Sequence, residues 1–472
     1  MKKSALKLVG ILCGMYLSAA LSHGATPPNF VIVLGDDINR DNLGCYGGGV
    51  TCDTPQLDRL AKNGVRFDRA YTSVAMCAPF RQELYSGRTP WRTKSFLNHS
   101  HSTEDTKSLP HYLTPLGYRV ALLGKSHIGP HKAYPFKYLG NTDDNAVFFD
   151  KTKEFIETCR KENRPFCLVI ASNDAHGPNT NGDASAYEPE SLKIPPYWID
   201  TLELRKSLPA YLAEVTNFDA LVGMVRGYLD DSGLAKETVL FACTEQGSHF
   251  PFSKWSCYDN GLHTGLIAYA PGRILSGHVS DELFWMCDVA PTIVEMAGGT
   301  FAADAFDGKS QVANLTGPAT RVHEYVFGAF TNKGIIGSKE RIYPIRSVRD
   351  GRYSLIYSPM SSAVTSNVTI DEALGLLQQG ATKRIRKVKT VAGSWVKSEG
   401  AEHPLVRRLH HRPEFALYDR QADPYELNDL SENPEYEPVL ERLKSALFEF
   451  LEAKGDADPV KTETVIKRSG NE

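Results

Sequence analysis

Asn29 to Leu34 reads NFVIVL, and Gly35-Asp36-Asp37 follows directly. A continuous run of apolar, mostly β-branched residues is typical of a parallel strand that is buried on both faces. Two adjacent carboxylates at the end of such a strand repel each other unless a cation or protons relieve them. The stretch therefore predicts an α/β sheet with a metal site at Asp36 and Asp37. The alternative is that one carboxylate only caps the next helix.

Three similar apolar runs occur later, and each ends in polar residues. They are Arg119 to Leu123 before Gly124-Lys125-Ser126-His127, Phe166 to Ala171 before Asn173-Asp174-Ala175-His176, and Thr238 to Ala242 before Thr244-Glu245-Gln246-Gly247. Helical patterns lie between the runs, at Pro55 to Lys62, Lys151 to Glu162 and Leu212 to Asp230. Alternating strands and helices predict a sheet with helices on both faces. Because ligands bind beyond the carboxyl ends of such strands, we expect the four strand ends to share one site.

The character of the sequence changes near residue 340. Ser347 to Tyr357 predicts two short strands around an Asp-Gly turn, and Glu435 to Glu452 predicts an amphipathic helix. Lys383 to Lys397 is basic, and we expect it to be irregular. A chain of 472 residues is too long for one core. We therefore expect a catalytic domain at 26–340 and a smaller C-terminal α+β domain, an antiparallel sheet plus a helix, at 341–472.

Residues 1–25 have the pattern of a secretory signal peptide: three lysines, an apolar run from Leu8 to Leu21, and then small residues. The apolar run is shorter than the roughly 20 residues that a membrane-spanning helix needs. No later stretch is long and apolar enough either. We therefore expect an exported protein, periplasmic or secreted, without a membrane span.

The net charge limits the kind of binding partner, and the cysteine spacing limits the kind of domain. The formal net charge of -3 becomes about -6 without the three leader lysines, which argues against a nucleic-acid partner. The cysteines are too scattered for the dense framework of a small disulfide-rich domain, although one or two disulfides stay open.

Cys77-Ala78-Pro79-Phe80-Arg81, followed by Ser86-Gly87-Arg88, is the most specific local signal. A cysteine taken alone is most often a buried thiol. The Cys-x-Pro-x-Arg pattern, set after Asp36-Asp37 and Thr54-Pro55-Gln56-Leu57-Asp58, resembles the formylglycine-dependent (type I) sulfatases of the alkaline-phosphatase superfamily. The resemblance implies an alkaline-phosphatase-like mixed sheet flanked by helices. It also implies that a formylglycine-generating maturation enzyme oxidises Cys77 to an aldehyde.

Within that family the chain is most similar to the heparan N-sulfatases (N-sulfoglucosamine sulfohydrolases). The motifs that carry this likeness are Gly124-Lys125-Ser126-His127-Ile128-Gly129-Pro130, Tyr134-Pro135-Phe136, Asp174-Ala175-His176, Tyr343-Pro344-Ile345-Arg346-Ser347-Val348, Leu417-Tyr418-Asp419-Arg420 and Asp423-Pro424. The last three of these groups fall in the expected second domain, so the resemblance extends beyond the catalytic domain.

The resemblance also implies a role for each candidate site residue. Asp36, Asp37, Glu245, Gln246 and the modified Cys77 bind the cation. Arg81 stabilises the hydrated aldehyde, Lys125 and His127 hydrogen-bond its hydroxyls, and His176 and Lys254 hold the sulfate. The all-oxygen ligand set favours Ca²⁺, with Mg²⁺ as the alternative.

Four positions depart from the family pattern. Phe80 replaces the usual serine of the maturation motif, Glu245 an aspartate, and Gln246 an asparagine or histidine. Lys254 stands where the heparan N-sulfatases carry arginine. The first departure bears on the conversion of Cys77, the next two on the metal, and the last on the N-sulfatase assignment.

The expected activity is hydrolysis of sulfate esters or sulfamates on sulfated carbohydrates. A hydroxyl of the hydrated aldehyde attacks sulfur, and the second hydroxyl loses its proton to His127 as sulfate is expelled. Two alternatives stay open: a phosphodiesterase or phosphonate monoester hydrolase of the same superfamily, and a non-catalytic protein that binds sulfated glycans if Cys77 is not converted. The basic run around Lys383 and Arg384 either contacts an anionic polymer or is a solvated face.

Overall fold

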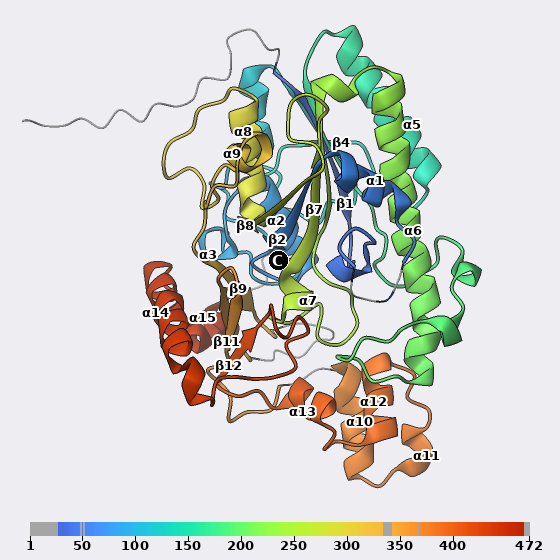
Figure 1. Cartoon of the computed structure of the whole chain (residues 1–472), viewed down its shortest axis with the longest axis vertical. Helices are drawn as coiled ribbons and strands as arrows, with labels where there is room; N and C mark the ends of the chain where they lie inside the picture. The colour runs from blue at the N-terminus through green and yellow to red at the C-terminus, as the bar shows by residue number, and fades with distance from the viewer. Residues whose placement is uncertain (1–26, 48–49, 51, 334–341, 366–367, 467–472) are drawn as a thin grey trace, which may run out of the picture.

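The structure is a computed structural model, and it describes residues 27–47, 50, 52–333, 342–365 and 368–466. The expected signal peptide at 1–25 lies outside the described residues. A large sheet between helices forms the upper body, and a second, smaller sheet lies below it beside α14 (Figure 1). This is the expected architecture of a mixed α/β body with a smaller antiparallel unit.

Eight strands form the large sheet, in the spatial order β4-β3-β5-β1-β6-β7-β2-β8. Their bounds are β1 Asn29–Gly35, β2 Val65–Tyr71, β3 Arg119–Gly124, β4 Lys137–Tyr138, β5 Phe166–Ala171, β6 Thr238–Thr244, β7 His263–Tyr269 and β8 His278–Trp285. β7 pairs antiparallel with β6 and with β2, whereas the other neighbours pair in parallel. All strands of this described sheet except β7 therefore point their carboxyl ends toward one edge.

The central strand β1 explains why its sequence is uninterruptedly apolar. Phe30, Ile32 and Leu34 pack into the core on one face of the sheet, and Val31 and Val33 pack into the core on the other face. Successive side chains of a strand point to opposite faces, so a strand covered on both sides needs apolar residues at every position. The prediction of a buried parallel strand is confirmed.

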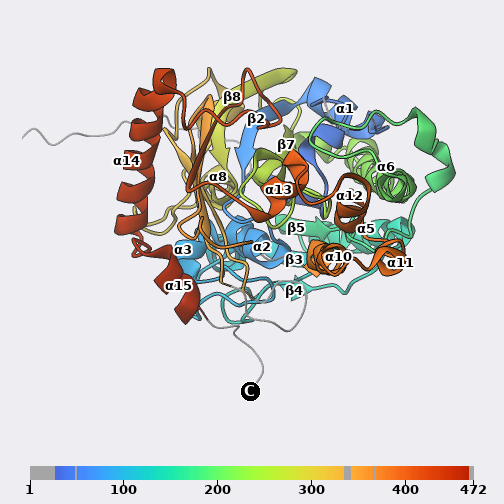
Figure 2. The ribbon, with the colours of Figure 1, turned by 90° about the horizontal axis from the view of Figure 1, so that it is seen from below.

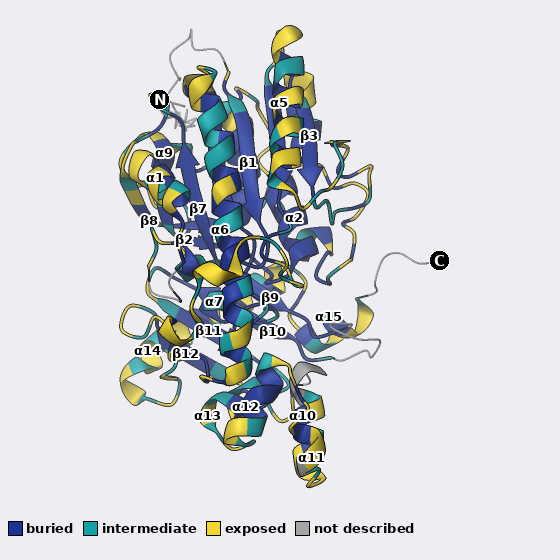
Figure 3. Ribbon diagram, turned by 90° about the vertical axis from the view of Figure 1, so that its right-hand side faces the viewer, coloured by how far each residue is buried: buried dark blue, intermediate teal, exposed yellow. Residues whose placement is uncertain are grey.

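Helices cover both faces of the large sheet. On one side lie α1 Pro55–Asn63, α5 Asn145–Lys161 and α6 Leu202–Asp231, and on the other α2 Cys77–Ser86, α4 Leu109–Leu113 and α8 Val289–Met296. Figure 3 shows exposed residues along the outer surfaces of α5 and α6, while the strands beneath them are buried. The helices expected near residues 55, 151 and 212 are all present.

The small sheet contains four antiparallel strands in the order β12-β11-β10-β9. They are β9 Val326–Phe330, β10 Ile345–Arg349, β11 Tyr353–Tyr357 and β12 Phe415–Asp419. β10 and β11 form the predicted hairpin, and the predicted amphipathic helix is α14 Glu437–Ala453, which packs on both strands. Because β9 belongs to this sheet, we propose that the second domain begins before Val326 rather than at residue 341.

The remaining helices complete both parts. They are α3 Pro90–Thr93, α7 Asp259–Leu262, α9 Val312–Thr316, α10 Val368–Gln378, α11 Thr382–Ile385, α12 Val391–Glu399, α13 Pro404–His410 and α15 Pro459–Val465. The expectation that Lys383 to Lys397 is irregular was wrong, since α11 and most of α12 fall there. α14 and α15 lie on one side of the molecule and α10 to α12 on the other (Figure 2).

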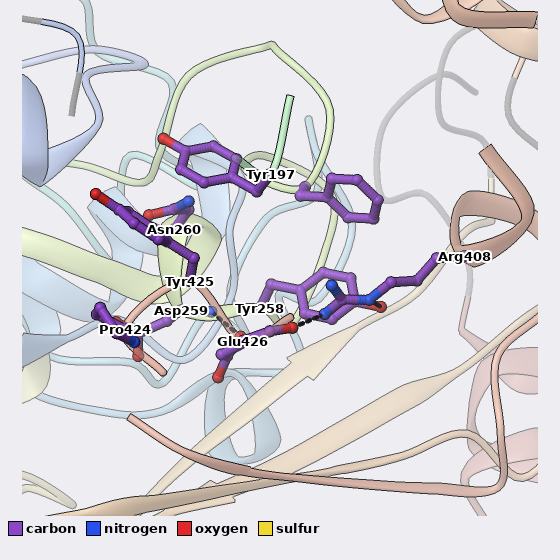
Figure 4. Close-up of a pocket in the computed structure, with 9 residues that line it drawn as sticks. Tyr197, Tyr258, Asp259, Asn260, Arg408, Pro424, Tyr425 and Glu426 are labelled. Carbon is purple, nitrogen blue, oxygen red and sulfur yellow. Dashed lines mark hydrogen bonds between the residues drawn. The ribbon is translucent and has the colours of Figure 1, made fainter. Parts of the chain in front are cut away.

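Polar contacts fix the small sheet against the edge of the large one where the site lies. The Oε2 of Glu426, which follows β12, accepts a hydrogen bond from the backbone N–H of Asp259 at 2.8 Å. Arg408 donates to the carbonyl of Glu426 and, at 3.2 Å, to the hydroxyl of Tyr258 (Figure 4). Asp259 opens the short helix α7 that leads into β7, so the second domain contacts the strand ends directly.

The described cysteines are all free thiols, so none of the disulfides left open by the sequence is formed among them. Among the described residues, no helix combines the length and the apolar character that a bilayer-spanning segment requires.

Candidate active site

Five parallel strands, rather than the expected four, deliver side chains to one edge of the large sheet. The fifth is β2, which the sequence analysis did not recognise; it runs in the direction of β1 and β6 and leads through Thr72 to Met76 into Cys77. The side chains that follow the five strands are Asp36 and Asp37 after β1, Cys77 after β2, Lys125 and His127 after β3, His176 after β5, and Glu245 and Gln246 after β6.

Four of these residues form a buried cluster with the chemistry of a cation site. Asp36, Asp37, Cys77 and Glu245 place one ligand atom each within 4.8 Å of one another. The Sγ of Cys77 lies 3.3 Å from Asp36 Oδ1 and 4.0 Å from Asp37 Oδ1. Carboxylate oxygens crowded in this way favour a hard divalent cation between them.

Gln246 completes the cluster and supports the fit of a cation. Its Nε2 donates to Asp37 Oδ1 at 2.6 Å, whereas its buried Oε1 has no hydrogen-bond partner among the residues that the structure describes. Turning the amide by half a rotation would exchange the two atoms and direct the oxygen toward the carboxylates. The unpartnered oxygen is therefore the group that a cation would satisfy.

Three cationic side chains balance the three carboxylates. Lys254 Nζ lies 2.8 Å from Asp37 Oδ2, Lys125 pairs with Asp36, and Arg81 pairs with Glu245 and, at 3.5 Å, with Asp36. Burial opposes ionisation of Asp36, but Lys125 and Arg81 together hold its pKa well below the usual range. Burial and the charge of Asp36 instead raise the pKa of Glu245 to about 8, despite Arg81.

Cys77 lies at the centre of these charges as the first residue of α2. Its Sγ is 3.3 Å from Lys254 Nζ, 3.4 Å from Gln246 Nε2 and 3.7 Å from Lys125 Nζ. Burial, and then the carboxylate of Asp36, raise the pKa of the thiol. An unmodified Cys77 is therefore a neutral thiol, and since the thiolate is the nucleophilic form, it is poorly suited to attack.

Three of the candidate residues are not in direct contact with the side chain of Cys77. His176 lies at the rim, with its side chain 43% exposed and Nε2 4.0 Å from Asp37 Oδ2. His127 Nε2 lies 2.6 Å from Nδ1 of His99. Arg81, which is fully buried, faces the carboxylates of Glu245 and Asp36.

Phe80, which departs from the family pattern, belongs to the hydrophobic core and is not one of the residues of the cluster. Its side chain is fully buried in the hydrophobic core beneath α2, next to residues of β1 and α8. Phe80 is therefore part of the hydrophobic core rather than of the polar cluster around Cys77.

His99 was not among the site residues predicted from the sequence. The residue lies in the loop after α3, within Asn98-His99-Ser100-His101, and follows no strand end or recognised motif. The one available signal was two histidines separated by a serine shortly after the Cys77 motif.

Comparison with known proteins agrees with this geometry. Residues 28–299 match the sequence model of the Sulfatase family. An ulvan-active sulfatase of Formosa agariphila is 31% identical over 93% of this chain and 82% of its own length. The human N-sulphoglucosamine sulphohydrolase is 26% identical over 93% of this chain and 92% of its own.

Solved structures show the same fold. A protein in complex with its substrate D-glucosamine-2-N,6-O-disulfate superposes with a TM-score of 0.68 at 18% identity, covering 92% of this chain and all of the other. A 2-O GAG sulfatase gives a TM-score of 0.66 at 19% identity, covering 93% and 96%. The family match spans more than half of the chain, and the strand ends carry the expected residues. The chain belongs to the sulfatase family and is a sulfuric ester hydrolase.

Proposed function

We propose that this chain is an exported sulfatase that acts on sulfated carbohydrates, with Cys77 converted to formylglycine beside a bound divalent cation. The observation that carries the proposal is the convergence of three carboxylates and two lysines on the Sγ of Cys77. The names of the two relatives, one active on ulvan and one on N-sulphoglucosamine, support a carbohydrate substrate.

The cation would be held by Asp36, Asp37, Glu245 and Gln246, with the modified side chain at position 77 as a further ligand. All of these ligand atoms are oxygens after conversion, which supports Ca²⁺ and leaves Mg²⁺ as the alternative. The cation would supply positive charge that polarises the sulfate. Thiolate and imidazole ligands, which mark zinc sites, are lacking from this set.

The protein side chains would do the rest of the chemistry. Hydration of the aldehyde gives position 77 a hydroxyl that can attack sulfur, which the neutral thiol of Cys77 cannot do. Lys125 and Lys254 lie beside that position and would stabilise the charge that develops on the sulfate oxygens, and His176 would contact the sulfate from the rim.

His127 would act as the general base. Burial, and then the charge of Lys125, lower its pKa to about 3, so the imidazole is neutral and able to accept a proton at physiological pH. A neutral imidazole beside Lys125 is the protonation state that the second step of the reaction requires.

Mass spectrometry of the peptide that contains Cys77 tests the conversion, since formylglycine is about 18 mass units lighter than cysteine. The protein is to be produced in its native host, with Cys77→Ala as the inactive control. A thiol in all of the native protein would favour the non-catalytic glycan-binding alternative. Parallel assays on aryl sulfate and aryl phosphate esters test the reaction class, and faster turnover of the phosphate would contradict the proposal.

N-sulfated glucosamine is the first substrate to test, on the likeness to the N-sulphoglucosamine sulphohydrolase. The higher identity to the ulvan-active sulfatase, and Lys254 in place of an arginine, support an O-sulfated polysaccharide as the second candidate. Desulfation of a panel of defined sulfated oligosaccharides separates them. Activity confined to O-sulfates would rule out the N-sulfatase assignment. N-terminal sequencing of the mature protein tests export and cleavage near residue 25.

A further inference from the structure

Two histidines from different parts of the chain form a close pair beside the cluster. His127 follows β3 and His99 lies in the loop after α3; the Nε2 of His127 is 2.6 Å from the Nδ1 of His99, and the ring centroids are 4.4 Å apart. One of the two nitrogens must carry a hydrogen, and the other must offer a lone pair. The contact therefore ties the tautomer of one ring to that of the other.

The neighbours of His99 hold it against the helix that carries Cys77. Asn98 Oδ1 accepts a hydrogen bond from the backbone N–H of Ala78 at 3.4 Å, and the carbonyl of Ser100 accepts one from Gln82 Nε2 at 2.9 Å. Both bonds are made to α2, one on each side of His99. The histidine is thus fixed relative to position 77 by the hydrogen bonds of its two neighbours and not only by its own ring.

Both histidines also have unusual backbone angles, with φ of 63° at His99 and 49° at His127. Left-handed conformations are uncommon for residues other than glycine and cost free energy, and they concentrate at functional sites. The surrounding structure therefore holds these two residues in the positions that bring their rings together.

The two ring nitrogens of His127 differ in their surroundings. Nε2 contacts His99, whereas Nδ1 is buried and has no hydrogen-bond partner among the described residues. A buried nitrogen without a partner is costly unless a ligand or substrate group satisfies it. Nδ1 is therefore the nitrogen of His127 that remains available to a bound group.

We propose that His99 is a positioning residue: its Nδ1 accepts the hydrogen of His127 Nε2, which fixes Nδ1 of His127 as the atom that takes the proton in catalysis. The proposal rests on the proposed function of His127 as general base. His99 itself is exposed at the surface, and a hydrogen on its Nε2 leaves the lone pair of Nδ1 for the hydrogen of His127.

The second step of the proposed reaction expels sulfate and forms the aldehyde again. The C–O bond to sulfate breaks and its electron pair leaves with the sulfate, while the remaining hydroxyl at position 77 gives its proton to Nδ1 of His127. The electron pair of that O–H bond becomes the second bond of the carbonyl. The positive charge on the His127 ring is then shared through Nε2–H with His99, as an aspartate does for the base of a hydrolase triad.

Two substitutions at position 99 separate positioning from packing. His99→Ala removes the acceptor and should lower kcat roughly tenfold or more, a part of the 10²–10⁴ that a general base supplies, with KM nearly unchanged. His99→Asn places an amide oxygen near the former Nδ1 and tolerates a positive φ, so it should restore most of kcat. His101→Ala is the matched control on the same loop and should leave kcat unchanged. A raised KM with unchanged kcat in His99→Ala would instead make His99 a substrate-binding residue.

A double-mutant cycle tests whether His99 acts through His127. In a His127→Ala background the further change His99→Ala should cost little, because the base it positions is gone. An undiminished loss in that background would overturn the proposal.

Imidazole ¹⁵N NMR of the full chain labelled in histidine gives a readout that does not need activity. It reports which nitrogen of His127 carries the hydrogen, with His127→Ala to assign the signal. The proposal expects hydrogen on Nε2 in the wild type and a mixture of tautomers in His99→Ala. Hydrogen on Nδ1 in the wild type would overturn it. An absence of sulfatase activity together with the expected tautomer would refute the proposed function and leave the pairing intact.

Discussion

At the scale of single residues, the site balances its charges without a cation only by pairing each carboxylate with a cationic side chain. Lys254 pairs with Asp37, and Lys125 and Arg81 pair with Asp36. Glu245 pairs with Arg81, but burial and the charge of Asp36 still raise its pKa to about 8. A bound divalent cation would relieve this crowding, and it would bind the folded protein only, because the unfolded chain does not assemble the ligands.

Removing the cation should therefore lower the stability of the protein. We expect the unfolding temperature to fall after chelation and to recover with Ca²⁺, since a ligand at 100 times its Kd stabilises a folded state by about 2.7 kcal/mol. Differential scanning calorimetry across a Ca²⁺ titration measures this, with Mg²⁺ as the comparison. An unfolding temperature that changes with neither Ca²⁺ nor Mg²⁺ would contradict a cation site.

Gln246→Leu should weaken that cation response. The leucine has nearly the same size as glutamine but no oxygen, so we expect about tenfold or greater loss of Ca²⁺ affinity, measured by isothermal titration calorimetry. Gln378→Leu on the exposed surface of α10 is the control and should bind like the wild type. Equal affinity in both variants would exclude Gln246 as a ligand.

A site residue could be predicted from the sequence when a strand end or a recognised motif positions it. Asp36 and Glu245 directly follow apolar strands, so the edge of the sheet was enough to bring them together. Cys77 was found from its motif, because β2 alternates charged and apolar residues and gave no sign of a buried strand. His99 follows neither a strand nor a motif, and its pairing with His127 depends on the path of a loop.

At the scale of elements, α2 is the helix that presents Cys77, and all ten of its residues are buried. Its amino terminus, where backbone N–H groups are unpaired and the helix dipole is positive, lies at the reacting position and favours an anion there. Its carboxyl end stops at Gly87, which has a φ of 66°. The helix is therefore fixed at both ends, and little of it can move independently of the core.

Gly87→Ala should destabilise the protein by more than the cost of placing an alanine in the left-handed conformation. A Cβ at this position would lie 2.5 Å from Phe306 Cδ1, in addition to the strain of a left-handed alanine. Gly117→Ala is a matched control, since its φ is also positive, at 92°, but no contact atom of the described part of the chain lies within 4 Å of the added Cβ. We expect about 1 kcal/mol for Gly117→Ala and about 1–3 kcal/mol more for Gly87→Ala in urea unfolding. Equal losses would show that the packing around Gly87 adapts freely.

Glu83, in the middle of α2, should contribute a pH-dependent term to stability. Burial raises its pKa to about 7 in the folded protein, although Ser73 donates to it from its backbone N–H at 2.9 Å. A carboxyl group with a raised pKa stabilises the fold below its unfolded pKa, and this contribution is lost as the pH rises toward about 7. Glu83→Gln should flatten stability between roughly pH 4.5 and 7, measured by urea unfolding across that range. An unchanged pH profile would contradict the raised pKa.

Strands that are buried on both faces of the sheet were predictable from their sequences. Elements whose burial depends on their place in the fold were not. β1, β3, β5 and β6 are covered on both faces, so their sequences are continuously apolar. β8 has exposed and intermediate positions near its start, because it forms one edge of the sheet. α12 was missed because the basic residues around it obscure the buried Trp395, which packs it into the main hydrophobic core.

At the scale of the whole molecule, one buried carboxylate connects the two sheets. Asp456, just after α14, accepts a hydrogen bond from the indole N–H of Trp91 in α3 at 2.7 Å. It also pairs with Arg346 of β10, whose Nη2 lies 3.1 Å from Oδ1. Trp91 belongs to the catalytic part and Arg346 to the small sheet, so a single side chain joins them. The small sheet thereby braces the segment that leads from α2 to the loop of His99.

Asp456→Ala should therefore destabilise the molecule and loosen the contact between its two parts. The change leaves the fully buried guanidinium of Arg346 without its carboxylate, which typically costs about 3–5 kcal/mol. Asp456→Asn keeps an oxygen for the indole N–H and should cost less. Glu104→Ala, which breaks the exposed pair with Lys132, should change stability by no more than about 1 kcal/mol. Urea unfolding followed separately by tryptophan fluorescence and by circular dichroism measures both effects. We expect the unfolding midpoint of Asp456→Ala to lie below that of Asp456→Asn, and a midpoint of Asp456→Ala near the wild-type value would show that Asp456 does not hold the two sheets together.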